Sequence, residues 1–129
     1  MKRNSAHFLP LFLAVLMLAA GGIAQSEAQS LNARLGELYQ KGDLDGAVSI
    51  AEQIVGIERK NTPVSKRNLT SALENLSQVK VDRVKRSMAE LRSSETNAED
   101  LPVILKTLRQ DAAETELTLR EALELSKGA

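Results

Sequence analysis

The sequence has 129 residues with 17 basic and 17 acidic side chains, one histidine and no cysteine. The lack of cysteine excludes a disulfide framework, and the balanced charge argues against general nucleic-acid binding, which relies on clustered Lys and Arg. Only 2% of the residues are aromatic, so the apolar content, mostly Leu, Ala, Val and Ile, favours helices packed through aliphatic side chains.

Residues 1–24 have the pattern of a signal peptide. A short basic region at 2–3 precedes an uncharged run at 8–20, which is shorter than the roughly 20 apolar residues of a membrane-spanning helix. Small side chains predict cleavage after Ala24, with Ala28 as the alternative. We therefore expect a periplasmic or secreted protein, in which an uncleaved anchor would be the sole contact with a membrane.

A polar linker at 25–30 and a single helical domain at 31–129 are expected to follow. Apolar residues at helical spacing predict a first helix over about 31–40. Gly42 and the aspartate after it interrupt this pattern, and a second amphipathic helix is predicted over about 44–59.

The third helix is expected to have Thr62 as its N-cap and Pro63 at its first position, and to end near Arg92. Alternating valines at 79–84 leave a short strand open, but a lone strand has no partner in this chain. A fourth helix is predicted from Asp100 to about residue 126. Short loops then favour an all-α fold of about four helices in antiparallel hairpins. The apolar stripe of the fourth helix comprises Leu101, Leu105, Leu108, Ala112, Leu119, Ala122 and Leu123, and Leu117 and Leu125 widen the apolar face.

Residues after 24 include neither Cys nor His, the side chains most often used as nucleophiles, general bases and soft metal ligands. Scattered single glycines offer no phosphate-binding loop. We therefore expect no enzyme, no cofactor and no metal. The charged residues are interpreted as solvated helix faces, with Glu116 and Arg120 as an i,i+4 pair. They are Lys80, Arg83, Lys85, Arg86, Glu114, Glu116, Glu121 and Glu124.

Residues 41–52 partly match a calcium-binding loop, with Asp43, Asp45 and Glu52 at ligand positions. Lys41 stands at the first position, where an anionic ligand is needed and a cation repels calcium. A calcium-responsive helical protein is therefore the third functional hypothesis, behind the two stated below and ahead of an enzyme.

Residues 31–61 resemble a tetratricopeptide repeat (TPR). The matching positions are Leu35, Gly36 and Tyr39 in the first helix, Gly42 and Asp43 in the turn, and Ala47 in the second helix. Residues 63–76 look like the start of a second repeat of the kinesin-light-chain-like type, which gives about one and a half repeats. In that part the packing positions are Ala72, Leu73 and Leu76.

The resemblance implies that Gly36 and Ala47 are small because two helices cross closely, and that Asp43 and Asp45 cap the second helix. It also implies a concave ligand surface formed by the first helix of each repeat. That surface would present Ala33, Glu37, Gln40, Thr70, Glu74 and Ser77. An amphipathic bundle, in which these six positions simply face solvent, is the alternative.

These observations favour an exported protein–protein interaction module, a TPR-like scaffold that binds another protein or peptide in a helical groove. Because repeat units normally need about three copies to bury a continuous core, a self-assembling structural or envelope-associated protein, completed as a homodimer, is the alternative function.

Overall fold

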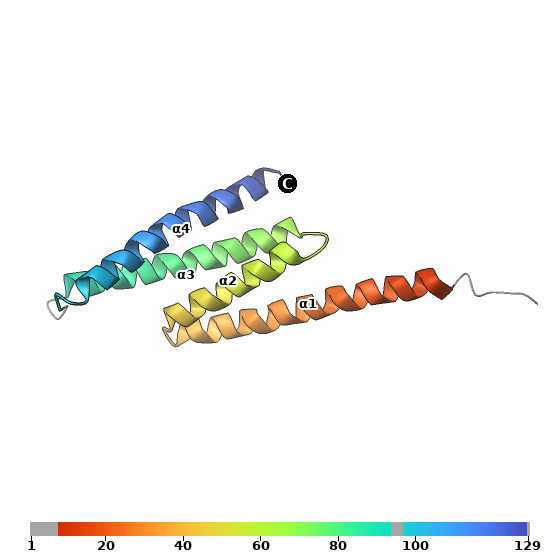
Figure 1. Ribbon diagram of the computed structural model, residues 1–129, viewed down its shortest axis with the longest axis horizontal. Helices are drawn as coiled ribbons and strands as arrows, with labels where there is room; N and C mark the ends of the chain where they lie inside the picture. The colour runs from red at the N-terminus through yellow and green to blue at the C-terminus, as the bar shows by residue number, and fades with distance from the viewer. Residues whose placement is uncertain (1–7, 94–96, 129) are drawn as a thin grey trace, which may run out of the picture.

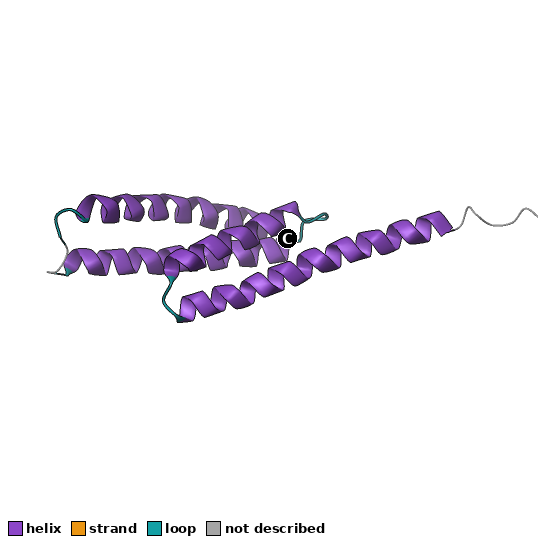
Figure 2. Ribbon diagram, turned by 60° about the horizontal axis from the view of Figure 1, so that its bottom comes forward, coloured by secondary structure: helices purple, strands orange, loops and turns teal. Residues whose placement is uncertain are grey.

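The structure, a computed structural model, describes residues 8–93 and 97–128, and of residues 8–21 and 24 it describes the backbone only. Within these ranges the chain forms four helices: α1 (Phe8–Gln40), α2 (Leu44–Lys60), α3 (Lys66–Arg92) and α4 (Leu101–Lys127). The predicted all-α fold is confirmed. Each helix packs mainly on the next one along the chain, and successive helices run in opposite directions (Figure 1). Figure 2 shows the connecting loops at alternate ends of the helices.

Helix α1 is longer than the sequence predicted. The expected linker at 25–30 is helical and continuous with the expected first helix. This stretch is polar but has neither Gly nor Pro, so nothing in it interrupts a helix. Ala28 is buried there. The N-terminal part of α1 extends past the other helices (Figure 1), and positions 1–7 of the predicted signal peptide lie outside the described residues.

The turn between α1 and α2 forms as the sequence predicted. Gly42 has a φ of +74°, a conformation that glycine adopts without a steric penalty. Its N–H donates to the carbonyl of Tyr39 at 3.0 Å, and the N–H of Asp43 donates to the carbonyl of Leu38 at 2.9 Å, which together terminate α1. The Asp43 carboxylate then accepts from the N–H of Gly46 at 2.9 Å. Asp43 is therefore the N-cap of α2.

Helix α3 begins three residues later than predicted. Thr62 and Pro63 lie in the loop, joined by a cis peptide bond, and are neither N-cap nor first helical residue. Ser65 is the N-cap, and its hydroxyl accepts from the N–H of Asn68 at 3.3 Å. A second capping residue close by thus replaces the first. The segment at 79–84, for which a strand was considered, is helical, and α3 is continuous to Arg92.

The hydrophobic core is centred on α2, which packs against α1 on one side and α3 on the other. Ala47 and Leu73, at 0% and 1% exposure, are among its most buried members. Five of the positions expected to pack between repeats belong to it: Leu35, Ala47, Ala72, Leu73 and Leu76. Two others, Gly36 and Tyr39, do not, since both are exposed.

Helix α4 does not bury the stripe that the sequence indicated. Its buried residues are Asp111, Thr115 and Ala122, and only Ala122 belongs to that stripe. The other members are exposed or half-buried. The reason is that α4 packs mainly on a single helix, α3, so the chain covers one narrow face of it.

Candidate binding groove

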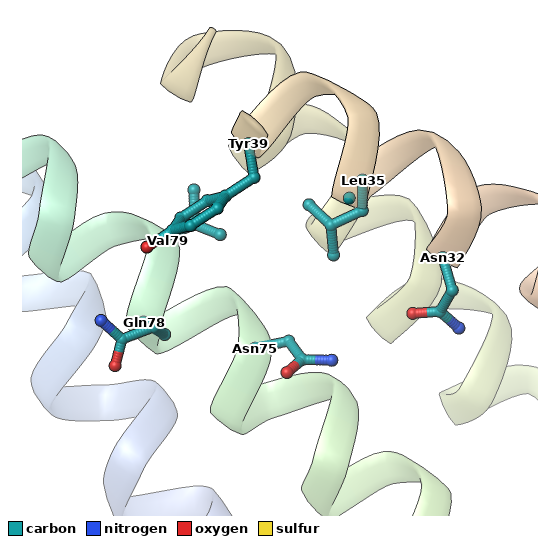
Figure 3. A pocket seen from close by; sticks show the side chains of 7 residues that line it. Asn32, Leu35, Tyr39, Asn75, Gln78 and Val79 are labelled. Carbon is teal, nitrogen blue, oxygen red and sulfur yellow. The ribbon is translucent and has the colours of Figure 1, made fainter. Parts of the chain in front are cut away.

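An open groove of about 320 Å³ lies between α1 and α3 (Figure 3). The buried side chains of Leu35 and Val79 give it an apolar base. A Cβ placed on Gly36 would meet no atom within 4 Å, so the missing side chain leaves this space open. The groove is lined by Asn32, Leu35, Gly36 and Tyr39 from α1 and by Asn75, Gln78 and Val79 from α3.

The same observation corrects the reason expected for Gly36. The residue was predicted to be small because two helices cross closely there. Since no atom of another helix lies within 4 Å of the Cβ position, no close crossing requires a glycine. Ala47 is fully buried, as a small residue at a helix contact should be.

Tyr39 and Asp82 close one end of the groove. The Tyr39 hydroxyl donates to the Asp82 carboxylate, which also accepts from Gln78 at 3.0 Å and from Lys85 at 3.1 Å. The hydrogen bond from Tyr39, followed by the one from Gln78, lowers the pKa of Asp82, and the same bond to a carboxylate raises the pKa of Tyr39. The ionised Asp82 carboxylate on α3 therefore holds the Tyr39 side chain of α1 in place through this hydrogen bond.

A second hollow of about 260 Å³ continues the groove toward the N-terminal part of α1. The two hollows share Asn32 and Asn75, so they form one path along the α1–α3 interface, which we call the amide groove. The second hollow is lined by Gln25, Ala28, Gln29, Asn32, Ile54, Glu58, Asn68, Ser71, Ala72 and Asn75.

Most of the carboxamide groups in the amide groove have hydrogen-bonding capacity to spare. Asn32 donates to the carbonyl of Ala28 at 2.9 Å, which leaves its side-chain oxygen open. Within the described part of the chain, no side-chain hydrogen bond is formed by Gln25, Gln29, Asn68 or Asn75. Each carboxamide offers two donors and an acceptor, the complement of a peptide backbone.

The charge of the amide groove favours neutral or basic ligands. No Lys or Arg is among its described lining residues. Its lining acid is Glu58, which is 6% exposed and accepts from Asn61 at 3.1 Å. An anionic phosphate backbone needs positive side chains, and this surface offers none.

The six residues expected on the concave surface are not those that line the groove. On α1 the predicted Ala33 and Glu37 each lie one position after a lining residue, as does Gln40. On α3, Ser77 is 3% exposed and donates to the carbonyl of Leu73 at 2.9 Å, so it is a core residue and cannot contact a ligand. One position on a helix is a rotation of about 100°, which is enough to move a side chain out of the groove. Thr70 and Glu74 also lie outside the lining.

A layer of charged side chains joins α2, α3 and α4 on the other side of α3. Arg83 of α3 makes a two-pronged contact with Asp111 of α4, which is 1% exposed, and also binds Asp45 of α2 at 2.8 Å. The Asp111 hydrogen bonds raise the pKa of Arg83. This pair therefore fixes α4 against α3 with a buried, charge-assisted contact.

Lys80 occupies the next turn of the same layer. Its side chain is only 4% exposed and contacts Glu114 of α4 and, at 3.3 Å, Glu52 of α2. The hydrogen bond from Lys80, followed by one from Gln110, lowers the pKa of Glu114. The prediction that Lys80 and Arg83 lie on a solvated face is therefore wrong, because their partners come from other helices. The predicted pair of Glu116 and Arg120 is present, at 2.6 Å.

The residues of the partial calcium loop have other partners. Asp43 caps α2 and Asp45 binds Arg83. In the part of the chain that the structure describes, no three His, Cys, Asp or Glu side chains are grouped so as to hold a metal ion. The capping role that the TPR resemblance implied for Asp43 is confirmed.

Comparisons with protein-family models, with curated proteins and with solved structures find no match to this chain. Among the described residues, no helix combines the length and apolar character needed to cross a membrane.

Proposed function

We propose that this protein is an exported binding module that holds an extended segment of a partner polypeptide in the amide groove, and that it is not an enzyme. The observation that carries the proposal is the row of carboxamides between α1 and α3, most of which have hydrogen-bonding groups that no other part of the described chain engages. An extended peptide presents N–H and C=O groups along its whole length, and carboxamides bind such groups whatever the peptide's side chains are.

The dimensions of the groove suit a short segment. From Gln25 to Tyr39 it follows α1 for 14 residues, or about 21 Å at the rise of an α-helix. An extended chain covers about 3.3 Å per residue, so about six peptide residues fit. The apolar base at Leu35 and Val79 would take one or two aliphatic side chains, and Glu58 would favour a basic one.

The TPR resemblance supports the proposal only in part. It implies a ligand surface formed by the first helix of each repeat, which here corresponds to α1 and α3, the two helices that supply most of the groove's lining residues. Gly36 and Ser77 depart from the roles that the resemblance gives them. The support for peptide binding therefore comes from the groove and not from the resemblance. We propose the TPR-like arrangement of the two helical hairpins in addition.

A peptide-display selection tests the binding function. Random decapeptides are selected against the protein, and the affinity of enriched sequences is measured by fluorescence anisotropy. The double variant Asn32→Ala, Asn75→Ala removes two central carboxamides and should weaken binding about 30-fold, at about 1 kcal/mol for each lost hydrogen bond. Gln53→Ala removes an exposed carboxamide from α2 and should change nothing. Equal binding by the double variant, with its helicity retained, would refute the groove as the site.

Export is tested separately by N-terminal sequencing of the protein recovered from cells that express the full chain. We expect a protein that begins at Gln25 and is found outside the cytoplasm. Cleavage after Ala28 would remove Gln25 and Ala28, two residues that line the groove, and should weaken peptide binding. An intact N-terminus in the cytoplasmic fraction would refute export while leaving the peptide-binding proposal to its own test.

A further inference from the structure

Helix α4 carries an apolar surface that the rest of the described chain leaves open. We call it the α4 stripe. Four of its five leucines, at positions 101, 105, 119 and 123, are 38%, 43%, 47% and 53% exposed, in that order. Ala112, near the middle, is exposed, and Leu108 is half-buried. The stripe comprises Leu101, Leu105, Leu108, Ala112, Leu119 and Leu123.

The four exposed leucines of the α4 stripe are spaced symmetrically about Ala112, whereas the half-buried Leu108 has Glu116 at its mirror position. Leu101 and Leu123 lie 11 residues before and after Ala112, and Leu105 and Leu119 lie seven residues before and after it. When two identical helices pair in antiparallel fashion about one residue, positions equally far from that residue lie opposite one another. Pairing about Ala112 therefore places leucine against leucine at four places. The small side chain of Ala112 lets the two helices approach at the centre.

The charges beside the α4 stripe favour the same arrangement. Arg109 and Glu116 lie seven residues apart, close to two helical turns, so both lie along the same edge of the stripe. In an antiparallel pair about Ala112, Arg109 of each copy lies beside Glu116 of the other. Arg109 forms no ion pair within the described chain, while Glu116 is 64% exposed and contacts Arg120. A parallel pair would not bring Arg109 and Glu116 together.

We propose that the α4 stripe is covered by a second copy of this chain, through an antiparallel, two-fold symmetric pairing of α4 with α4 centred at Ala112. From Leu101 to Leu123 the contact would extend for about 33 Å at the rise of an α-helix. The alternation of four- and three-residue steps from 101 to 112 is the pattern by which helices pack side by side. The interface lies on α4, so the dimer leaves the amide groove between α1 and α3 accessible and does not depend on the proposed peptide binding.

Single cysteines test the geometry directly, because the chain has none of its own. Under mild oxidation of the full-chain protein, Ala112→Cys should form a disulfide-linked dimer, since the two positions meet at the symmetry axis. Leu117→Cys, at an exposed position off the stripe, is the matched control and should remain largely uncoupled. A yield for Ala112→Cys no higher than for Leu117→Cys, in proteins of equal helicity, would overturn the proposal.

A second pair of variants tests whether the two α4 helices of the dimer run antiparallel or parallel. Leu105→Cys should not couple to itself, because in the antiparallel pair the two copies of position 105 are about 21 Å apart along the axis, far beyond the roughly 7 Å limit between Cα atoms for a disulfide. A mixture of Leu105→Cys and Leu119→Cys should give the mixed dimer. Self-coupling of Leu105→Cys, or failure of the mixture to couple, would overturn the antiparallel arrangement.

Charge reversal provides a test without cysteine. Glu116→Arg places like charges beside each other across the interface and should weaken the dimer at least tenfold, as measured by sedimentation equilibrium of the full-chain protein. Adding Arg109→Glu restores opposite charges and should recover most of that loss. Equal dissociation constants for the original protein, the single variant and the double variant would contradict the proposed register.

Discussion

The Asp111→Asn substitution should lower the free energy of unfolding by about 3 kcal/mol. Asp111 is 1% exposed, and both of its carboxylate oxygens accept hydrogen bonds from Arg83, one of them at 2.6 Å. Asparagine keeps the shape but removes the charge and turns one acceptor into a donor that faces the guanidinium. Removing one partner of a buried pair costs about 3–5 kcal/mol. The lower end applies because the Arg83 side chain is 20% exposed and keeps Asp45.

Urea denaturation followed by far-ultraviolet circular dichroism measures this loss. In a domain of 60–100 residues, 3 kcal/mol corresponds to a fall of about 12–24 °C in Tm. The matched control is Asp45→Asn, which removes the other carboxylate bound to Arg83. The Asp45 side chain is 87% exposed, so its loss should cost less than about 1 kcal/mol.

The double variant Arg83→Met, Asp111→Leu separates the net value of the pair from the penalty of leaving one charge alone. Replacing both members of a buried ion pair with apolar side chains is often neutral or stabilising, so the double variant should be more stable than Asp111→Asn. If Asp111→Asn costs no more than Asp45→Asn, the contact does not hold α4 against α3 and the reasoning fails.

Three further predictions concern the core, the glycines and pH. Leu73→Ala should cost about 2–5 kcal/mol in a denaturant titration, because Leu73 is 1% exposed. Gly42→Ala should cost about 1–2 kcal/mol since its φ is +74°, whereas Gly36→Ala should raise Tm, gaining up to about 1 kcal/mol of helix propensity. Lys80 lowers the pKa of Glu114, so this carboxylate stabilises the fold above its unfolded pKa of about 4.3 and loses that effect as pH falls through the folded value. The Tm of Glu114→Gln should therefore be below that of the original protein near neutral pH and approach it in acid; a constant difference would contradict the assignment.

The features predicted correctly from the sequence are those set by local chemistry. The turn at Gly42 and the cap at Asp43 depend on residues that are neighbours in the chain, and the apolar face of α2 is visible as a helical period. The start of α3 was misplaced because Thr62 and Ser65 are both good caps, and a local pattern does not say which is used. The linker at 25–30 was inferred from polarity, but its polar side chains belong to a helix whose exposed side forms part of the groove.

The charged layer could not be predicted, for a different reason. Arg83 binds Asp111 at a separation of 28 residues, and Lys80 binds Glu114 at a separation of 34. Sequence rules for helix charges concern partners three or four positions away, and they identified the pair of Glu116 and Arg120 for that reason. Partners on another helix depend on how the helices are rotated about their axes, which no local pattern fixes.

Helix α4 shows how such a failure can be informative. A stripe of leucines at helical spacing is evidence that this face is buried, and the sequence assigned it to the core of a single chain. The structure uses a different face, with Asp111, Thr115 and Ala122 buried and Asp111 paired with Arg83 of α3. Four of the leucines, at 101, 105, 119 and 123, are then 38–53% exposed, at positions symmetric about Ala112. The helical spacing of the leucines and their exposure in the single chain agree if a second copy of the chain buries this face. The periodicity of α4 then describes the dimer and not the single chain.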